Sequence, residues 1–389
     1  MKSALSGSKR DDCPGKLDDR REAGLNSGHL DLFAPGNRRS VSLHACLCAA
    51  FLVLFALSAG LGRAQESAPA PPSPIDEAAT LLNEGKPREA LVLLTQISEK
   101  DPKMPGLEAK LGKAYFQLRQ FSQATPHLKN ALQQNDGDLE STQLLALSLY
   151  YAGNCREALP LLEKLGPRLP TNIPDAPYVT SICYVMTEQL DNARKALAQM
   201  FSVAPDSAMA YLTLGKLLVR QHKVEAAVPP IETALRLQPR IAMAHFLLGE
   251  IDLYRSNLHD AVAEFQKELA VNPTMWLVYW RLGDAYMRLA KYDDAESVLK
   301  KAIWLNESSP GAFVLLGEIA LKKNDPALAS GFLERALAID PQNPDAHYAL
   351  ATAYKALGRE TEANQQLEIS KKLRNEKQDR AKDKLEPLP

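Results

Sequence analysis

Residues 276–306 read WLVYWRLGDAYMRLAKYDDAESVLKKAIWLN, and this stretch decides the fold. Leu282, Gly283 and Tyr286 share one face of a helix, and a second run of the same spacing begins at Ala295. The small side chains of Gly283 and Ala295 allow two helices to cross closely, because a larger side chain would not fit at the crossing. The stretch therefore predicts two amphipathic helices that pack as a hairpin.

The hairpin pattern recurs along the chain at intervals of 34 residues, with a single interval of 35. Each unit has an alanine in its second helix, at Ala90, Ala124, Ala158, Ala193, Ala227, Ala261, Ala295, Ala329 and Ala363. Four residues later comes a large apolar residue, at Leu94, Leu128, Leu162, Leu197, Ile231, Phe265, Leu299, Leu333 and Leu367. Twelve residues before the alanine the side chain is always small, at Ala78, Gly112, Ala146, Ser181, Gly215, Gly249, Gly283, Gly317 and Ala351. We number positions within a unit so that this alanine is the twentieth.

The period and the fixed positions resemble the tetratricopeptide repeat (TPR), a helix-turn-helix unit of 34 residues. The resemblance covers residues 71–377. It implies an all-α fold, a right-handed superhelical solenoid of antiparallel helix hairpins with eight to nine repeats. In such a solenoid the first helices line a concave face, and the fifth and ninth positions of each unit lie on it.

Composition fits a folded protein that does not bind nucleic acid. The chain has 389 residues, 46% of them hydrophobic, and a formal net charge of −1. Binding to phosphates depends on clustered lysine and arginine, which a near-neutral chain does not offer. A partner made of protein or peptide fits this balance better.

Changes in composition divide the chain into five segments. We predict a disordered N-terminal segment over 1–39, a signal peptide or signal anchor over 40–64, a proline-rich linker over 65–75, the TPR solenoid over 76–377 and a charged C-terminal tail over 378–389.

The second segment predicts export of a bacterial type. Arg38 and Arg39 precede an uncharged run with an apolar centre at 45–59, and the run ends near residues 62–64 in a small-x-small pattern typical of a cleavage site. The alternative is a membrane tether through residues 40–62, which are numerous enough to span a bilayer. In both cases the repeats lie beyond the cytoplasmic membrane, in the periplasm or secreted.

Cys155 and Cys183 are the two cysteines within the repeats. The predicted hairpins place them at the same edge of adjacent layers, and an exported protein meets an oxidising compartment. The sequence allows either a disulfide or two buried free thiols.

No enzymatic motif occurs: the phosphate-binding loop, the GxSxG elbow and HExxH are all missing. The histidines form no metal-spaced pair, and the carboxylates follow helix-surface spacing. We therefore predict a protein that is not an enzyme and needs no cofactor and no metal.

The predicted concave face supplies a candidate binding groove. Five residues at the fifth position are apolar or aromatic, namely Tyr178, Leu212, Phe246, Trp280 and Tyr348. Three successive acids occupy the ninth position, namely Glu250, Asp284 and Glu318. This combination favours an extended partner segment with apolar anchors and positive charge. The alternative is that the fifth-position side chains pack against neighbouring first helices.

The sequence thus predicts a non-catalytic scaffold that binds a protein or peptide in its groove. One alternative is a regulatory or recruiting subunit of a cell-envelope enzyme complex. A second is a glycan-binding protein that uses Trp280 with Glu250 and Asp284.

Overall fold

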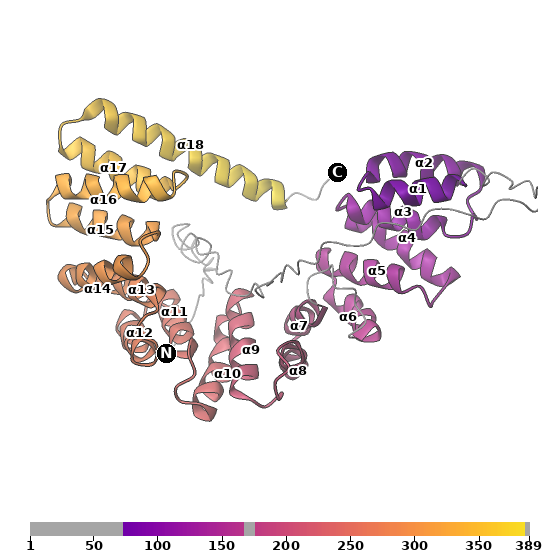
Figure 1. Cartoon of the computed structure of the whole chain (residues 1–389), viewed down its shortest axis with the longest axis horizontal. Helices are drawn as coiled ribbons and strands as arrows, with labels where there is room; N and C mark the ends of the chain where they lie inside the picture. The colour runs from indigo at the N-terminus through magenta and orange to yellow at the C-terminus, as the bar shows by residue number, and fades with distance from the viewer. Residues whose placement is uncertain (1–72, 167–175, 386–389) are drawn as a thin grey trace, which may run out of the picture. The chain divides into compact units, whose positions relative to one another are not determined.

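The computed structural model describes residues 73–166 and 176–385. All regular structure in these two ranges is helical, and eighteen helices follow one another along them (Figure 1). The predicted all-α fold is confirmed. The helices are α1 Pro74–Asn83, α2 Pro87–Lys100, α3 Leu107–Gln117, α4 Phe121–Gln134, α5 Leu139–Tyr151, α6 Cys155–Leu165, α7 Ala176–Met186, α8 Leu190–Met200, α9 Ala208–Arg220, α10 Val224–Leu237, α11 Ala244–Tyr254, α12 Leu258–Val271, α13 Trp276–Arg288, α14 Tyr292–Leu305, α15 Pro310–Lys322, α16 Pro326–Ile339, α17 Pro344–Ala356 and α18 Glu360–Leu385.

Each odd-numbered helix packs against the even-numbered helix that follows it, as the 34-residue pattern predicts. The alanine at the twentieth position is fully buried in most pairs, and Ala295 has no exposed surface. Where the eighth position is glycine, it lies against the large apolar residue of the second helix: Gly112 faces Leu128, and Gly317 faces Leu333. The close crossing inside each pair therefore depends on residues from both helices.

A left-handed backbone residue ends the first helix of every pair in the described ranges. These residues, all with positive φ, are Gly85, Arg119, Gly153, Glu188, His222, Ser256, Ala290, Asn324 and Gly358. The residue after it turns its N–H back toward the helix, as when Lys291 N donates to Tyr286 O at 2.9 Å. This closes the helix end and starts the second helix at once.

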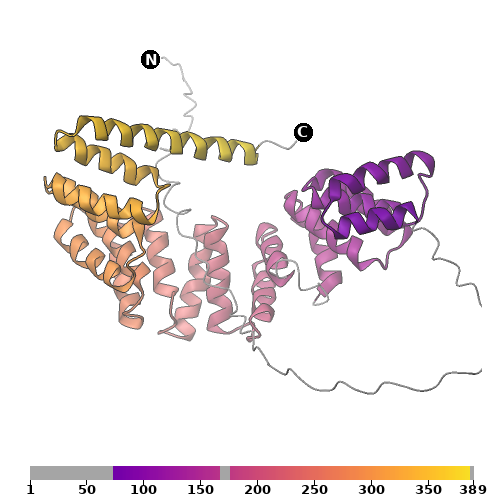
Figure 2. The same ribbon diagram turned by 45° about the horizontal axis from the view of Figure 1, so that its top comes forward.

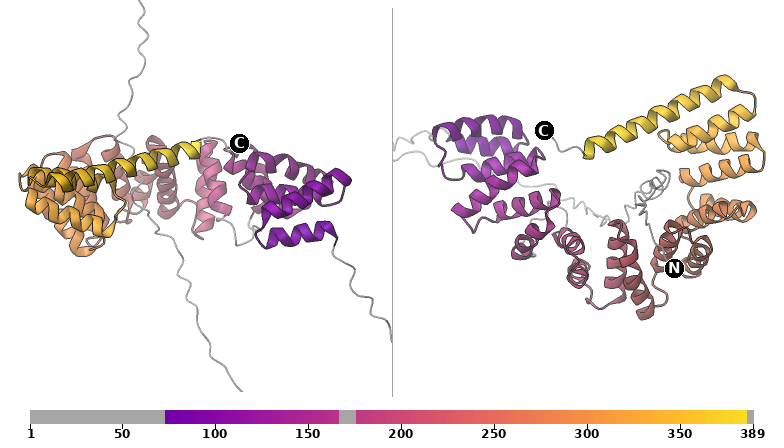
Figure 3. Two further views of the ribbon diagram at one scale, coloured as in Figure 1. Left: turned by 90° about the horizontal axis from the view of Figure 1, so that it is seen from above. Right: turned by 180° about the vertical axis from the view of Figure 1, so that it is seen from behind.

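Successive pairs pack along the chain, each second helix lying against the first helix of the next pair (Figure 3). Polar side chains also join neighbouring first helices at their C-terminal ends. Gln117 Nε2 donates to Leu82 O at 3.1 Å, and five repeats further along Arg288 donates to Leu253 O at 3.4 Å. These bonds satisfy carbonyl groups that a helix end leaves without an internal partner.

The last helix runs across residue 377, where the predicted solenoid meets the predicted charged tail. α18 is 26 residues long and continues to Leu385, twice the length of α17 (Figure 2). Its sequence lacks proline and glycine and is rich in good helix formers, so nothing stops the helix at 377. Ser370 and Arg374 fix α18 to the start of α17, because Ser370 Oγ donates to Pro344 O at 2.7 Å and Arg374 pairs with Asp345 at 2.9 Å.

All described residues belong to one unit, 69–389. None of the helices in the two described ranges is long and apolar enough to cross a membrane. The predicted segments 1–39 and 40–64, with the tether 40–62, lie outside the described residues.

Candidate functional site

The acids at the ninth position come from three successive first helices. Glu250 is on α11, Asp284 on α13 and Glu318 on α15, and each directly follows the glycine that faces the second helix of its own pair. One residue further along a helix turns the side chain by about 100°. The three carboxylates therefore leave the core of their pairs and lie on the face made by the first helices, which we call the first-helix face.

Glu250 forms a nearly buried ion pair with the next first helix. Its Oε2 accepts from the guanidinium of Arg281 at 2.7 Å, and the side chains are only 10% and 14% exposed. Burial raises the pKa of Glu250, and the charge of Arg281 opposes this rise. The second oxygen of Glu250, Oε1, is buried and accepts no hydrogen bond within the described ranges.

Asp284 and Glu318 have no ion-pair partner among the described residues. Burial raises the pKa of Asp284, although the charges of Arg281 and Arg288 oppose it. Burial also raises the pKa of Glu318 to about 7, and the nearby carboxylates of Asp345 and Asp284 add to the effect. A partly buried carboxylate whose pKa stays raised despite nearby cations is often part of a functional site, so these two residues are candidates for binding a cation.

The fifth position does not supply the predicted row of exposed anchors. Phe246 is 2% exposed and Leu212 is 7% exposed, so the prediction that they line an open groove is wrong. Both belong to the continuous core between pairs, where the ring of Phe246 lies 5.9 Å from that of Phe265. The alternative given by the sequence, packing between neighbouring helices, holds for these two residues.

Trp280 is half-buried because its side chain packs against the neighbouring first helix, α15. Its ring lies over the N-terminus of α15, and a Cβ atom placed on Gly311 would come within 2.9 Å of it. The guanidinium of Arg281 lies 4.6 Å from the centre of the same ring. The indole Nε1 is buried and donates no hydrogen bond within the described ranges. Trp280 thus forms part of the wall beside the acids and holds Arg281 in place.

The two tyrosines of the predicted groove stay partly accessible. Tyr178 on α7 is half-buried and has the guanidinium of Arg220 at 5.7 Å from its ring centre. Tyr348 on α17 is 52% exposed, with Arg374 of α18 at 5.3 Å. Of the five fifth-position residues, Tyr348 is the most exposed and lies on the helix next to Glu318.

Sequence reasoning missed the basic residues that accompany the acids. Arg281 follows Glu250 by 31 residues, a spacing that only becomes a contact once two repeats are stacked. On α9, burial lowers the pKa of Lys216 and the charge of Arg220 adds to that effect. Along the first-helix face, the ninth position is a lysine on α9 and an acidic residue on α11, α13 and α15.

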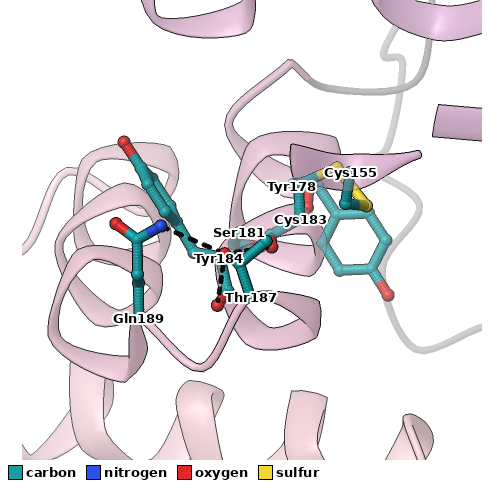
Figure 4. The surroundings of a disulfide bond; sticks show 7 residues. All are labelled: Cys155, Tyr178, Ser181, Cys183, Tyr184, Thr187 and Gln189. Carbon is teal, nitrogen blue, oxygen red and sulfur yellow. Dashed lines mark hydrogen bonds between the residues drawn. A yellow bond between two sulfur atoms is a disulfide. The ribbon is translucent and has the colours of Figure 1, made fainter. Parts of the chain in front are cut away.

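Cys155 and Cys183 are joined by a disulfide (Figure 4). Cys155 is the first residue of α6, Cys183 lies within α7, and their Cα atoms are 4.8 Å apart. Beside the bond, Thr187 Oγ1 donates to Cys183 O at 2.9 Å and accepts from Gln189 Nε2 at 3.1 Å. The bond links the third and fourth helix pairs through a 28-residue separation.

No three His, Cys, Asp or Glu side chains gather as a metal site in the part of the chain that the structure describes. The histidine rings at the fourth position instead contact their own second helices. His245 Nδ1 lies 2.7 Å from Glu264, and His347 Nδ1 lies 2.6 Å from Gln366. These contacts join the first helix of each of these pairs to its second helix.

Comparison with known families gives tetratricopeptide repeats in two groups of segments. One model of the tetratricopeptide repeat matches residues 212–270, 251–313 and 280–344, and another matches 81–125 and 320–383. Together the matched segments cover more than half of the chain. No curated protein matches the chain.

Three solved structures that match this chain are those of MamA, YrrB and PilF. A crystal structure of MamA is 21% identical and covers 42% of this chain and 96% of its own, with a TM-score of 0.39. YrrB, described as a TPR protein with an unusual peptide-binding site, is 20% identical over 47% of this chain and 93% of its own, with a TM-score of 0.40. PilF of Pseudomonas aeruginosa is 23% identical over 42% of this chain and 75% of its own, with a TM-score of 0.40.

Proposed function

We propose that this chain, which belongs to the tetratricopeptide repeat family, is a non-catalytic scaffold whose first-helix face binds an extended, positively charged segment of a partner protein. The site lies over α11, α13 and α15. The observation that carries the proposal is the pair of partly buried carboxylates, Asp284 and Glu318, which form no ion pair with a cation of the described residues.

A lysine or arginine side chain is the group that fits this site. Asp284 and Glu318 raise one another's cost of ionisation, as the effect of Asp284 on the pKa of Glu318 shows. A cation between them would stabilise both charged forms, and a partly buried pair is screened less by salt than a surface pair. Arg281 already serves Glu250 in this manner, one repeat earlier.

The neighbouring residues favour an extended segment that carries more than one charge. Tyr348 offers an exposed ring on the C-terminal side of the acids. On the N-terminal side, Lys216 and Arg220 of α9 favour a carboxylate or a polar residue in the partner. The partner segment would then carry its positive charge toward α15 and its polar or acidic part toward α9.

The proposal places the protein and its partner outside the cytoplasm. The apolar segment within 40–64 and the disulfide between Cys155 and Cys183 both favour a location beyond the cytoplasmic membrane, because disulfides persist in oxidising compartments. Candidate partners are therefore proteins of the cell envelope or of the secreted fraction.

A peptide titration tests the proposal directly. Labelled lysine-rich, glutamate-rich and neutral peptides are titrated by fluorescence anisotropy against the wild type and against the double variant Asp284→Asn, Glu318→Gln. We expect the lysine-rich peptide to bind the wild type and to lose about tenfold or more in affinity with the double variant. The variant Asp294→Asn, Glu307→Gln removes two exposed acids from the α14 region and is the matched control. Equal affinity of the lysine-rich peptide for all three proteins, or stronger binding of the glutamate-rich or neutral peptide, would refute the proposal.

A further inference from the structure

A second exposed surface lies on the even-numbered helices, away from the acids. Trp304, in the last turn of α14, is 71% exposed. The equivalent positions one repeat earlier and later are Ala270 and Ala338, which are exposed and too small to cover it. Trp304 therefore offers a large aromatic surface to solvent, which becomes informative together with the pocket and the charges beside it.

A pocket lies directly beside Trp304. Its volume is about 600 Å³, and it opens between α13 and α14. The lining residues are Tyr279, Ser297, Val298, Lys300, Lys301 and Trp304. Val298 contributes an aliphatic side chain to the lining and Tyr279 an aromatic one. The Tyr279 hydroxyl donates a hydrogen bond to Pro273 O at 3.1 Å. This is a mixed pocket that would take one apolar side chain.

The charges at the rim of this pocket are positive. Lys301 Nζ lies 3.8 Å from the centre of the Trp304 ring and pairs with no carboxylate in the described ranges. Lys300 does have a partner, Glu296, at 2.6 Å. None of the six lining residues is acidic.

We propose that this surface, Trp304 with Tyr279 and Lys301, is a second docking site that binds an acidic segment of a partner protein. An apolar side chain of that segment enters the pocket against Trp304. A carboxylate of the segment pairs with Lys301. The choice of an acidic partner follows from charge complementarity: Lys301 has no carboxylate partner in the described ranges, and it lines a pocket that holds no acid.

The proposal is independent of the first-helix face and predicts the opposite charge preference. The first-helix face is formed by odd-numbered helices and takes cations, whereas the second site is formed mainly by α14 and takes anions. A scaffold with both sites would hold two partners at once, or two segments of one partner, without competition.

The test uses the purified chain and short labelled peptides read by fluorescence anisotropy. The probe is a glutamate-rich peptide with one central phenylalanine, compared with the same peptide carrying lysine in place of glutamate and with vesicles of anionic lipid. We expect the acidic peptide to bind the wild type and to lose about tenfold or more in affinity with Trp304→Ala and with Lys301→Glu. Because Trp304 is exposed, circular dichroism should show unchanged folding in both variants.

Two controls keep the outcome specific. Val92→Ala removes another exposed apolar residue, on α2, and should bind the acidic peptide as the wild type does. The double variant Asp284→Asn, Glu318→Gln should also bind it normally, so failure of the first-helix proposal can be distinguished from failure of this one. No binding of the acidic peptide, equal binding by Trp304→Ala, or preference for the lysine peptide or the vesicles would overturn the inference.

Discussion

Gly283 on α13 and Leu299 on α14 lie so close that a Cβ atom on Gly283 would stand 2.5 Å from Cγ of Leu299. The same relationship joins Gly249 to Phe265 and Gly317 to Leu333. The hairpin therefore closes through a glycine on one helix and a large apolar side chain on the other. Ala295, fully buried one turn before Leu299, lines the same crossing.

Replacing Gly283 by alanine should destabilise the protein. Alanine improves helix propensity by about 1 kcal/mol, but overpacking a tight site costs roughly 1–3 kcal/mol, so we expect a net loss. Gly331, inside α16, has open space around the position of a Cβ atom and is the matched control. Gly331→Ala should raise the free energy of unfolding by about 0.5–1 kcal/mol. Thermal denaturation of both variants checks this, and an equal gain in stability would contradict the packing described.

Removing the carboxylate of Glu268 should destabilise the start of α11. Glu268 is fully buried, and its two oxygens accept from the backbone N–H groups of Met243 at 2.7 Å and Phe246 at 3.3 Å. No side chain of α11's own N-cap residue does this. Glu268→Ala leaves two buried donors without acceptors, which costs roughly 2–3 kcal/mol. The exposed neighbour Lys267→Ala serves as the comparison in urea denaturation, and similar midpoints for the two variants would count against this role.

Most of the fold could be predicted from the sequence because the hairpin is specified by local spacing. Gly283, Ala295 and their equivalents recur at 34-residue intervals, and each contact they make lies within one unit. The left-handed residue that closes each first helix was not identifiable, since only three of the nine in the described ranges are glycine and Ala290 adopts the same φ.

Stability should fall as pH rises through neutrality because of Glu318. Its pKa is about 7 in the folded protein and near 4.5 when unfolded, so the folded state holds an extra proton between these values. Raising the pH removes that proton and lowers the free energy of unfolding, by roughly 1–3 kcal/mol between about pH 5 and pH 8. Asp284, Asp345 and Lys322 face this group and set the size of the effect.

Glu318→Gln isolates that contribution, since the amide does not titrate. We expect the difference in free energy of unfolding between variant and wild type to shift in favour of the variant as pH rises from about 4.5 to about 7, and to level off above that range. Chemical denaturation at a series of pH values measures it. A difference that does not depend on pH would mean that Glu318 titrates as an ordinary exposed glutamate.

Loss of the disulfide should loosen the junction between the third and fourth helix pairs. The bond joins α6 to α7 across 28 residues, and removing a bond of that kind costs roughly 2–4 kcal/mol. We expect the variant Cys155→Ser, Cys183→Ser to unfold at lower temperature than the wild type without reductant, and reduction to bring the wild type to the same value. Alkylation of both thiols in denatured, unreduced protein would show instead that the cysteines are free.

Some features of the candidate site could be predicted from the sequence and others could not, and the difference has a physical cause. The acids at the ninth position follow the helix phase of a single unit, so Glu250, Asp284 and Glu318 could be placed on the first-helix face from the sequence. The burial of Phe246 and the pairing of Glu250 with Arg281 depend on how adjacent units stack. The burial and the ion pair are both contacts between units, and the 34-residue pattern within one unit does not specify how units stack.

Site-specific photo-crosslinking in the native host tests the central claim most directly. A benzophenone amino acid is placed at Thr352, exposed on the first-helix face beside Tyr348, and separately at Val92 on α2. The account predicts that the Thr352 probe captures a partner through a segment containing lysine or arginine, and that Asp284→Asn, Glu318→Gln abolishes this capture. Capture that persists unchanged in the double variant, or that maps to a segment without basic residues, would contradict it.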